Sequence, residues 1–485
     1  MPLILPGNVA AATAATTFDA ANSCRFSLGD SPYMQKTQVA PTSQQKWTYS
    51  GWLKKIENTS SAHQVFFAAG TASDSIYFDF KFKTDDTLDI EMDSTTGGST
   101  TALQTGTTFL FRDPAAWYHV VVAVDSTQST AADRSNLYVN GVKLTGPWAQ
   151  EVYPPEDHNF GAFAADSIIT VGRSATASNQ YFNGYMAEVV FIDGTQYAAS
   201  DFGEFDEDSP SVWKPKDVSG LTFGNNGFYL DFEASDNLGN DVNGGTDLTE
   251  TNLAATDQMT DSPTNNFPIS NPLMHGAANL TSTTHSQGNL IVTADSNAWR
   301  SAVATFGASA GKWYMECKFT TLGNAMPGVI GEKTIAEWGS TGCDHPGKCD
   351  LSVAYYSLSG IKIVEDTNSS YGDSFSTSDI IGTALDLDNG FVYFSKNNTW
   401  QDSGDPTSGA TGTGAITLPT FAGTWFFMQG TGGNPTSAVC ELNYGNPAFA
   451  LSSAESDANG YGSFEYAPPS GYLALCTKNL GSDGG

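Results

Sequence analysis

Three carboxylates alternate along one short stretch of the chain, Asp89-Ile90-Glu91-Met92-Asp93. In an extended strand Asp89, Glu91 and Asp93 face the same side, with about 6.8 Å between successive members. Carboxylates held close together can raise one pKa and lower another, as acid–base hydrolysis of a glycosidic bond requires. This stretch is the most enzyme-like pattern in the sequence.

A charge-matched hairpin explains the same residues without catalysis. The preceding stretch, residues 76–83, alternates apolar and polar residues, and Asp85-Asp86-Thr87 can form a three-residue loop. The predicted cross-strand pairs are Lys83 with Asp89, Phe82 with Ile90, Lys81 with Glu91 and Phe80 with Met92. Such pairs contribute roughly 0.2–1 kcal/mol each, and the lysines would lower the carboxylate pKa values, which does not suit a general acid. We therefore predict a structural hairpin and no enzyme.

Candidate ligand-binding residues lie in loops of the second half of the chain. The most unusual loop, residues 332–350, contains Trp338, Asp344 and His345, and Tyr371 and Trp400 lie in other Gly- and Ser-rich turns. An exposed Trp is a stacking platform for a sugar ring, whereas a Trp in the core is the commoner structural alternative. These five residues are the predicted binding site.

The cysteines and histidines indicate structure rather than metal chemistry. Cys343 and Cys349 bracket a short loop and are a candidate disulfide, with free buried thiols as the alternative. Only His345 lies near them and no second cysteine pair has ligand spacing, so we predict no zinc site. His119 falls within an apolar stretch, and we predict a hydrogen-bonded structural histidine.

The composition predicts an all-β fold. Charged residues make up only 15 % of the 485 residues and aromatic residues 12 %, with abundant Gly, which suits short strands and tight turns. Asn140-Gly141 and Asn389-Gly390 each follow a strand-like stretch, and Asn-Gly favours a two-residue type I′ hairpin turn. We expect two antiparallel β-sandwich (jelly-roll) domains in tandem, joined by an irregular connector.

The domain boundaries follow the changes in composition. We predict an N-terminal arm over 1–16, a first sandwich over 17–205, a connector packed on it over 206–287, a second sandwich over 288–480 and a tail over 481–485. The connector is rich in Asp, Asn and Pro, which favour turns over helices.

The net charge of −31 limits the partners. A chain with this negative charge repels nucleic-acid backbones and anionic membrane surfaces. Bound Ca²⁺ could offset part of the charge. The longest apolar run, residues 120–124, is far shorter than the about 20 residues of a membrane span. We also expect no signal peptide, because the first basic residue is Arg25. No cofactor is predicted.

Motifs in both halves resemble known families. The first sandwich resembles concanavalin A-like, laminin-G-type jelly rolls through residues 47–53 (WTYSGWL), 117–120 (WYHV), 137–141 (LYVNG), 183–189 (NGYMAEV) and 191–194 (FIDG). The second resembles SPRY domains through residues 311–316 (GKWYME), 381–388 (IGTALDLD), 394–397 (FSKN) and 442–445 (LNYG). A glycoside hydrolase family with the concanavalin-like fold has Glu at the outer positions of its carboxylate motif, where this chain has Asp89 and Asp93.

The combination of domains resembles virion proteins of tailed bacteriophages, especially marine and cyanobacterial ones. The matching segments are residues 200–205 (SDFGEF), 226–232 (NGFYLDF) and 261–267 (DSPTNNF). The resemblance implies a non-enzymatic fibre or spike, assembled in the host cytoplasm and released by lysis, that adsorbs to a host glycan or surface protein. A passive capsid or tail decoration protein is the alternative, and a glycan-cleaving enzyme is the remote one. The expected partners are other virion proteins, bound through the arm, and further copies of the chain, with a trimer as the expected symmetry.

Overall fold

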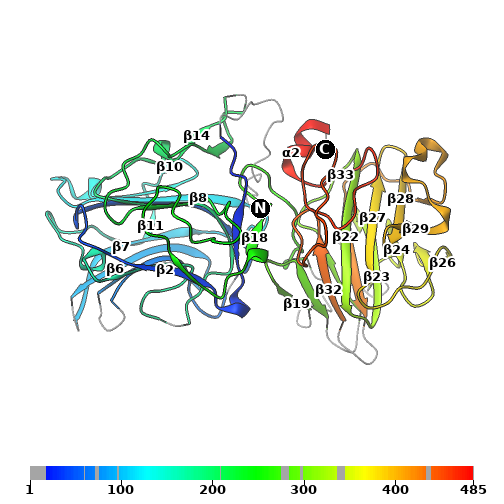
Figure 1. Ribbon diagram of the computed structural model, residues 1–485, viewed down its shortest axis with the longest axis horizontal. Helices are drawn as coiled ribbons and strands as arrows, with labels where there is room; N and C mark the ends of the chain where they lie inside the picture. Colours follow the sequence, from blue (N-terminus) through cyan, green and yellow to red (C-terminus); the bar gives the residue numbers. More distant parts are fainter. Residues whose placement is uncertain are drawn as a thin grey trace. The chain divides into compact units, whose positions relative to one another are not determined.

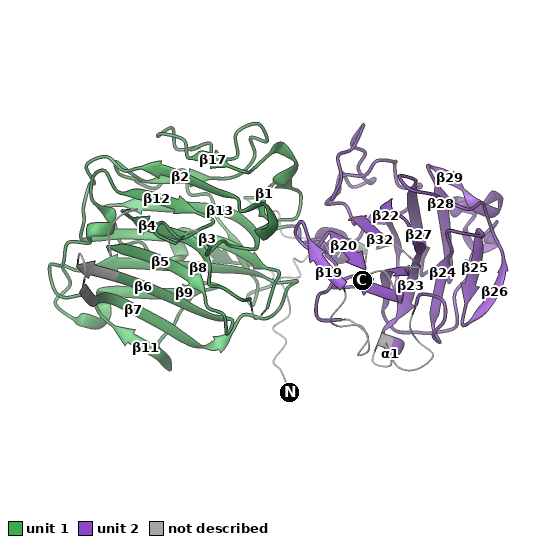
Figure 2. Cartoon of the chain, turned by 90° about the horizontal axis from the view of Figure 1, so that it is seen from below, with its two compact units in different colours: residues 1–8, 13–264 green, residues 9–12, 265–485 purple. Residues whose placement is uncertain are grey.

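The computed structural model describes residues 18–58, 60–71, 76–95, 98–177, 179–207, 209–274, 283–294, 299–335, 345–432 and 438–483. Their strands form several sheets in two compact units, one ending at Thr264 and the other beginning at Asn265 (Figures 1 and 2). The predicted all-β fold with tandem antiparallel sandwiches is confirmed. The predicted arm, residues 1–16, lies outside the described residues.

Unit 1 is built from two large sheets, each of eight strands. The first, sheet A, has the order β10-β9-β8-β3-β13-β1-β18, with β16 pairing with β13. Its strands are β1 (Ser23–Phe26), β3 (Lys46–Lys55), β8 (Trp117–Asp125), β9 (Ser135–Val139), β10 (Val142–Lys143), β13 (Gly184–Asp193), β16 (Phe228–Leu230) and β18 (Gln258–Met259). The second, sheet B, has the order β11-β7-β6-β5-β4-β12-β2-β17. Its strands are β2 (Tyr33–Thr37), β4 (Gln64–Gly70), β5 (Tyr77–Phe82), β6 (Thr87–Thr95), β7 (Gly98–Leu110), β11 (Trp148–Val152), β12 (Ile168–Val171) and β17 (Thr249–Thr251).

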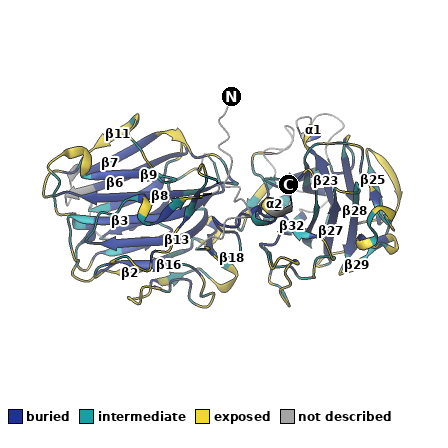
Figure 3. Ribbon diagram, turned by 90° about the horizontal axis from the view of Figure 1, so that it is seen from above, coloured by how far each residue is buried: buried dark blue, intermediate teal, exposed yellow. Residues whose placement is uncertain are grey.

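Aromatic side chains from both sheets fill the interior of unit 1. Trp47 of β3 meets Phe78 of β5 edge to face at 4.9 Å between ring centroids, and Tyr49 stacks on Phe67 at 4.5 Å. Apolar residues at alternate positions of β5 and β6 point to this core, which leaves the intervening polar residues on the other face of sheet B. Figure 3 shows the same burial along the strands of both units.

Unit 2 is also a pair of sheets. The larger has the order β19-β20-β32-β22-β27-β28-β29, with β30 on β28 and β33 running parallel to β22, and the smaller has the order β21-β31-β23-β24-β25-β26. The strands of the larger sheet are β19 (Thr283–Ser286), β20 (Ile291–Ala294), β22 (Lys312–Thr321), β27 (Ile380–Asp386), β28 (Phe391–Lys396), β29 (Thr399–Trp400), β30 (Ile416–Thr417), β32 (Ala438–Asn443) and β33 (Leu473–Ala474). Those of the smaller are β21 (Trp299–Val303), β23 (Asn324–Gly331), β24 (Ser352–Tyr355), β25 (Ile361–Val364), β26 (Thr367–Ser370) and β31 (Trp425–Gly432).

Helices contribute little to either unit. The α-helices are α1 (Glu332–Ile335) and α2 (Thr477–Asp483), and the 3₁₀ turns are Leu28–Asp30, Ala131–Asp133, Gly161–Phe163, Ala199–Asp201, Ala255–Asp257, Gln401–Ser403 and Pro406–Thr411. Within the ranges given above, no helix has the length and apolar character of a membrane span.

The two Asn-Gly predictions have different outcomes. Asn140 and Gly141 both have positive φ, and Val139 pairs with Val142, so the two-residue turn is confirmed. The prediction at Asn389-Gly390 is wrong, because Asp386 pairs with Phe391 and the loop therefore holds four residues. Asp386 accounts for the longer loop, since its carboxylate accepts hydrogen bonds from the backbone and side chain of Asn389.

The predicted register of the β5–β6 hairpin is wrong by two residues. Lys81 lies opposite Asp89, Asp79 opposite Glu91 and Phe80 opposite Ile90. The loop begins one residue earlier, at Thr84, because Lys83 and Thr87 close it by a backbone hydrogen bond and Asp86 adopts a φ of 69°. The Asp86 carboxylate is held there by Lys55 Nζ and Arg112 Nε, each at 2.7 Å. A shift of two preserves which face each residue points to, so the core and the charged face are as predicted.

The predicted connector, 206–287, is divided between the units and contains strands. Residues up to Thr264 belong to unit 1, where β16, β17 and β18 extend its two sheets, and a two-stranded ribbon of β14 (Gly203–Phe205) and β15 (Trp213–Pro215) adds Trp213. Trp213 Nε1 donates to His119 Nδ1 at 2.9 Å, and His119 Nε2 bonds the Ser50 hydroxyl at 2.8 Å. Burial lowers the pKa of His119 to about 3, so it is neutral, and the predicted structural role of His119 is confirmed.

Candidate functional site

One polar row crosses all of sheet B on the face opposite the core. Each strand contributes one residue, and each of these residues lies opposite the next one on the neighbouring strand. We call this set the polar row. Its members, from one edge to the other, are Val152, Gln104, Glu91, Asp79, Ala68, Thr170, Gln35 and Thr249. A second row, two residues further along the strands, contains Gln150, Gly106, Asp89, Lys81 and Val65. Carboxylates, amides, an amine and small residues therefore share one sheet face.

Lys81 lies between two carboxylates of β6. Its Nζ lies 2.5 Å from Glu91 Oε2 and 3.8 Å from Asp89 Oδ2. Asp89 is only 2 % exposed, whereas the Glu91 side chain is 26 % exposed and is the more open of the two. Among the described residues Asp89 Oδ1 has no hydrogen-bond partner, although a buried carboxylate oxygen normally has one.

A glycine is packed closely against that oxygen. Gly106 lies opposite Asp89, and a Cβ at this position would come within 2.9 Å of Asp89 Oδ1 and 3.7 Å of Gln150 Oε1. Gln150 Oε1 in turn accepts from Gln104 Nε2 at 2.8 Å. Any larger residue at 106 would therefore displace the side chains that present donors and acceptors at this point.

Burial shifts the pKa of two carboxyl groups on this face. It raises the pKa of Asp89 to about 6, although Lys81 acts to lower it. It also raises the pKa of Asp79 to about 6, against the influence of Lys81 and of the hydrogen bond from Ser174. The expectation that lysine neighbours would depress the carboxylate pKa values is therefore wrong for Asp89, because desolvation outweighs the ion pair.

Two loops cover part of the face. Ser174 Oγ donates to Asp79 Oδ1 at 3.1 Å, and Ala175 packs with Val65 and Ala68. His63 lies near Lys81. Burial lowers the pKa of His63, and the positive charge of Lys81 lowers it further. The described residues contain no group of three or more His, Cys, Asp or Glu side chains arranged to hold a metal ion.

Three of the residues predicted to bind a ligand in unit 2 are described, and each has different neighbours. Tyr371 is 6 % exposed, packs against Tyr355 and Phe394, and accepts a hydrogen bond from the Phe394 backbone, so its ring belongs to the core. Trp400 is half-buried against a different part of the interior. His345 packs on Trp299 at 4.7 Å between ring centroids. Trp338 and Asp344 lie outside the described residues.

Cys349 is disulfide-bonded. Cys24, Cys317, Cys440 and Cys476 are free and buried, and Cys343, the predicted partner of Cys349, lies outside the described residues.

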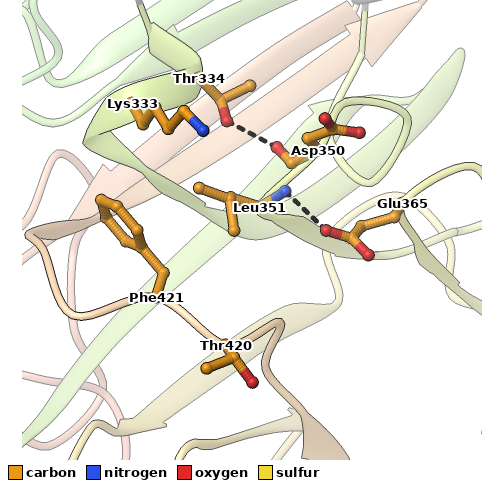
Figure 4. A pocket seen from close by; sticks show the side chains of 7 residues that line it. All are labelled: Lys333, Thr334, Asp350, Leu351, Glu365, Thr420 and Phe421. Carbon is orange, nitrogen blue, oxygen red and sulfur yellow. Dashed lines mark hydrogen bonds between the residues drawn. The ribbon is translucent and has the colours of Figure 1, made fainter.

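A small pocket of about 200 Å³ lies at the described ends of the 332–350 loop (Figure 4). It is lined by Lys333, Thr334, Asp350, Leu351, Glu365, Thr420 and Phe421. Leu351 has a φ of 51°, and its backbone N–H donates to Glu365 Oε1 at 3.0 Å while its carbonyl accepts from Gly331. Nothing in the sequence marks Leu351, because the strained backbone is imposed by contacts from distant strands.

Sequence reasoning found the charged stretch of β6 but missed the rest of the polar face. Gln104, Gly106 and Gln150 come from β7 and β11, and the only sequence signal for them is alternation within strands whose register was unknown.

Comparison with known proteins supports the concanavalin-like prediction for the first half. Residues 28–199 match the family model described as the Concanavalin A-like lectin/glucanases superfamily, and these residues include both rows except Thr249. No curated protein matches the chain.

Solved structures similar to the chain include two SPRY domains and a toxin. A human SPRY domain is 15 % identical, with 32 % of this chain and 90 % of that chain covered and a TM-score of 0.23. The SPRY domain of human HERC1 is 16 % identical, with 32 % and 87 % covered and a TM-score of 0.24. Stonustoxin is 18 % identical, with 36 % and 27 % covered and a TM-score of 0.25. The chain thus spans only a minor part of stonustoxin.

Proposed function

We propose that this protein is a non-enzymatic binding protein of a tailed-phage virion surface, which adsorbs to a host glycan through the polar face of sheet B. The observation that carries the proposal is the cluster of Lys81, Asp89 and Glu91 beside Gly106. Carboxylates accept hydrogen bonds and side-chain amides both donate and accept them, so together they can pair with the neighbouring hydroxyl groups of a sugar. The Glu91 side chain, which is 26 % exposed, is the carboxylate of this cluster that a sugar hydroxyl can reach.

The name of the matched superfamily, which includes lectins, agrees with this ligand class. The virion location rests on the resemblance of residues 200–205, 226–232 and 261–267 to phage proteins. The acidic charge favours a neutral or cationic surface polymer over an anionic one.

Binding is tested on an array of bacterial surface polysaccharides with the purified chain. Glu91→Gln should weaken binding about tenfold or more, because it replaces a charged carboxylate with a neutral amide that has only one acceptor oxygen. Gly106→Val should abolish binding by filling the space beside Asp89. Glu156→Gln, an exposed acid paired with Arg134 away from both rows, should bind as the wild type does. Equal binding by all four proteins would refute the polar face as the contact.

The virion role has its own test. Free protein should bind intact host cells and block infection. A decoration protein would do neither, and would instead co-purify with capsids in high copy.

Glycan cleavage is the second candidate, favoured by the pKa of about 6 at Asp79 and Asp89. A carboxyl group of that pKa can act as a general acid near neutral pH. Against it, Lys81 directly neutralises Glu91. Incubation of any bound polysaccharide should release no reducing ends, and release that is lost in Asp89→Asn would establish the enzyme instead.

A further inference from the structure

A lysine and an aspartate meet in a fully buried site of unit 1, away from the polar row. Lys54 Nζ of β3 lies 2.6 Å from Asp261 Oδ2, and both side chains are 0 % exposed. Asp261 follows β18 and lies close to the end of unit 1 at Thr264. The two residues are 207 positions apart in the chain.

Aromatic neighbours on both sides enclose the pair. Lys54 lies directly opposite Trp117 of β8 and Tyr185 of β13, so the three side chains form a row on the outer face of sheet A. Trp117 Nε1 donates to Asp261 Oδ1 at 3.1 Å, and Lys54 Nζ lies 5.8 Å from the Tyr185 ring centroid. The Asp261 carbonyl accepts from the Ser23 hydroxyl at 2.6 Å, which fixes the backbone of this segment.

Such an environment disfavours separated charges. Burial lowers the pKa of Lys54, with Asp261 opposing the shift. Proton transfer from the ammonium to the carboxylate gives a neutral amine beside a neutral carboxylic acid, and a dry site favours that neutral pair far more than water does. A neutral amine is a nucleophile, and the carbon of a protonated carboxyl group is its electrophile.

We propose that Lys54 Nζ and Asp261 Cγ join in an intramolecular amide bond after the chain folds. The Nζ lone pair forms a bond to Cγ, the Cγ–OH bond breaks, and the hydroxyl leaves with a proton from Nζ as water. An ammonium and a carboxylate thus become one secondary amide and one water molecule, with no oxidant or other reactant.

The geometry favours the forward reaction in three ways. The fold holds the amine against the carboxyl group, which replaces a bimolecular encounter. The Trp117 N–H is directed at Oδ1, the oxygen on which negative charge develops as nitrogen adds. Exclusion of water from the site disfavours the reverse hydrolysis.

A neighbouring pair provides an internal contrast. Lys55 Nζ lies 2.7 Å from Asp86 Oδ1 and is also buried, but Arg112 Nε donates to the other oxygen of Asp86 at 2.7 Å. A guanidinium stays charged and so keeps Asp86 ionised, which removes its electrophilic character. Only the Lys54–Asp261 pair should react.

Intact-mass spectrometry of the purified full-length chain tests the bond. The wild type should be lighter than its sequence mass by one water, and a protease digest should contain one branched peptide linking Lys54 to Asp261. Lys54→Met should show its full sequence mass, whereas Lys55→Met should still lose one water.

Asp261→Asn gives a sharper outcome. Attack on the carboxamide releases ammonia and yields the same amide, so this variant and the wild type should converge on one final mass. Trp117→Phe should slow the loss of water after refolding but should still end one water below its own sequence mass, as expected of a group that polarises the carbonyl. A wild-type chain of full sequence mass, or a loss of water without the branched peptide, would overturn the proposal.

Discussion

The two outer faces of unit 1 carry similar charge pairs in opposite surroundings. On sheet A both side chains of the Lys54–Asp261 pair, at 2.6 Å, are fully buried, and Arg25 pairs with Asp257 from the segment that also supplies Asp261. On sheet B the Lys81–Glu91 pair, at 2.5 Å, keeps Glu91 partly open to solvent, and no returning segment supplies a partner for Asp89 Oδ1 among the described residues. Nearly equal distances therefore accompany different surroundings, because both side chains of the sheet A pair are fully buried whereas the Glu91 side chain on sheet B is 26 % exposed.

The largest effect should come from breaking the covered pair. Asp261→Ala should lower the free energy of unfolding by about 3–5 kcal/mol, because it removes the proposed cross-link and leaves the amine of Lys54 buried without its partner. Urea denaturation followed by tryptophan fluorescence measures the change. Glu156→Ala, which breaks the exposed pair with Arg134, should cost less than about 1 kcal/mol. If both variants lost the same unfolding free energy, burial would not explain how much each pair stabilises the fold.

A change of intermediate size should appear in the pH dependence of stability. The pKa of Asp79 is about 6 in the folded chain against 3.8 for the ordinary group, so the folded state holds the proton more tightly. Its contribution is fully present below about pH 4 and is lost as the pH rises through 6. The wild type should therefore lose about 2–3 kcal/mol more unfolding free energy than Asp79→Asn as the pH rises through this range. The free energy of unfolding is measured at pH 4 and pH 7.5 for both proteins. An equal change between the two pH values in variant and wild type would contradict the raised pKa of Asp79.

The smallest effect on stability should come from the open pair. Glu91→Gln should change the free energy of unfolding by less than about 1 kcal/mol, because solvent can replace the lost partner of the carboxylate. The same variant should lose glycan binding, so stability and binding separate at this residue. Thermal unfolding of the Glu91→Gln sample used on the array measures its stability. A loss of stability as large as that of Asp261→Ala would show that the two faces do not differ in this respect.

Alternation in the sequence predicted which face each β5 and β6 residue occupies, because period-two patterning survives a register shift of two. It did not predict the register, because the positive φ of Asp86 depends on Lys55 and Arg112, which are distant in sequence. Tyr371 was assigned to a surface loop from its Gly- and Ser-rich surroundings, yet its ring fills the interior beside Phe394.

The covered face of sheet A escaped prediction for a related reason. Asp257, Asp261 and Trp213 lie in a segment without periodicity, and their partners on sheet A, which are Arg25, Lys54 and His119, lie far along the chain. Local patterns carry no trace of such contacts. The family resemblance compensated in part, since residues 28–199 match the concanavalin-like model.

The segment that covers sheet A also determines where unit 1 can be separated from the rest of the chain. A fragment ending at residue 205, the predicted end of the first sandwich, would lack Trp213, Asp257 and Asp261. It would therefore leave His119, Arg25 and Lys54 of sheet A without these partners. A fragment ending at Thr264 keeps them all. Limited proteolysis of the native chain should accordingly spare residues 213–261 and release a stable piece that retains them.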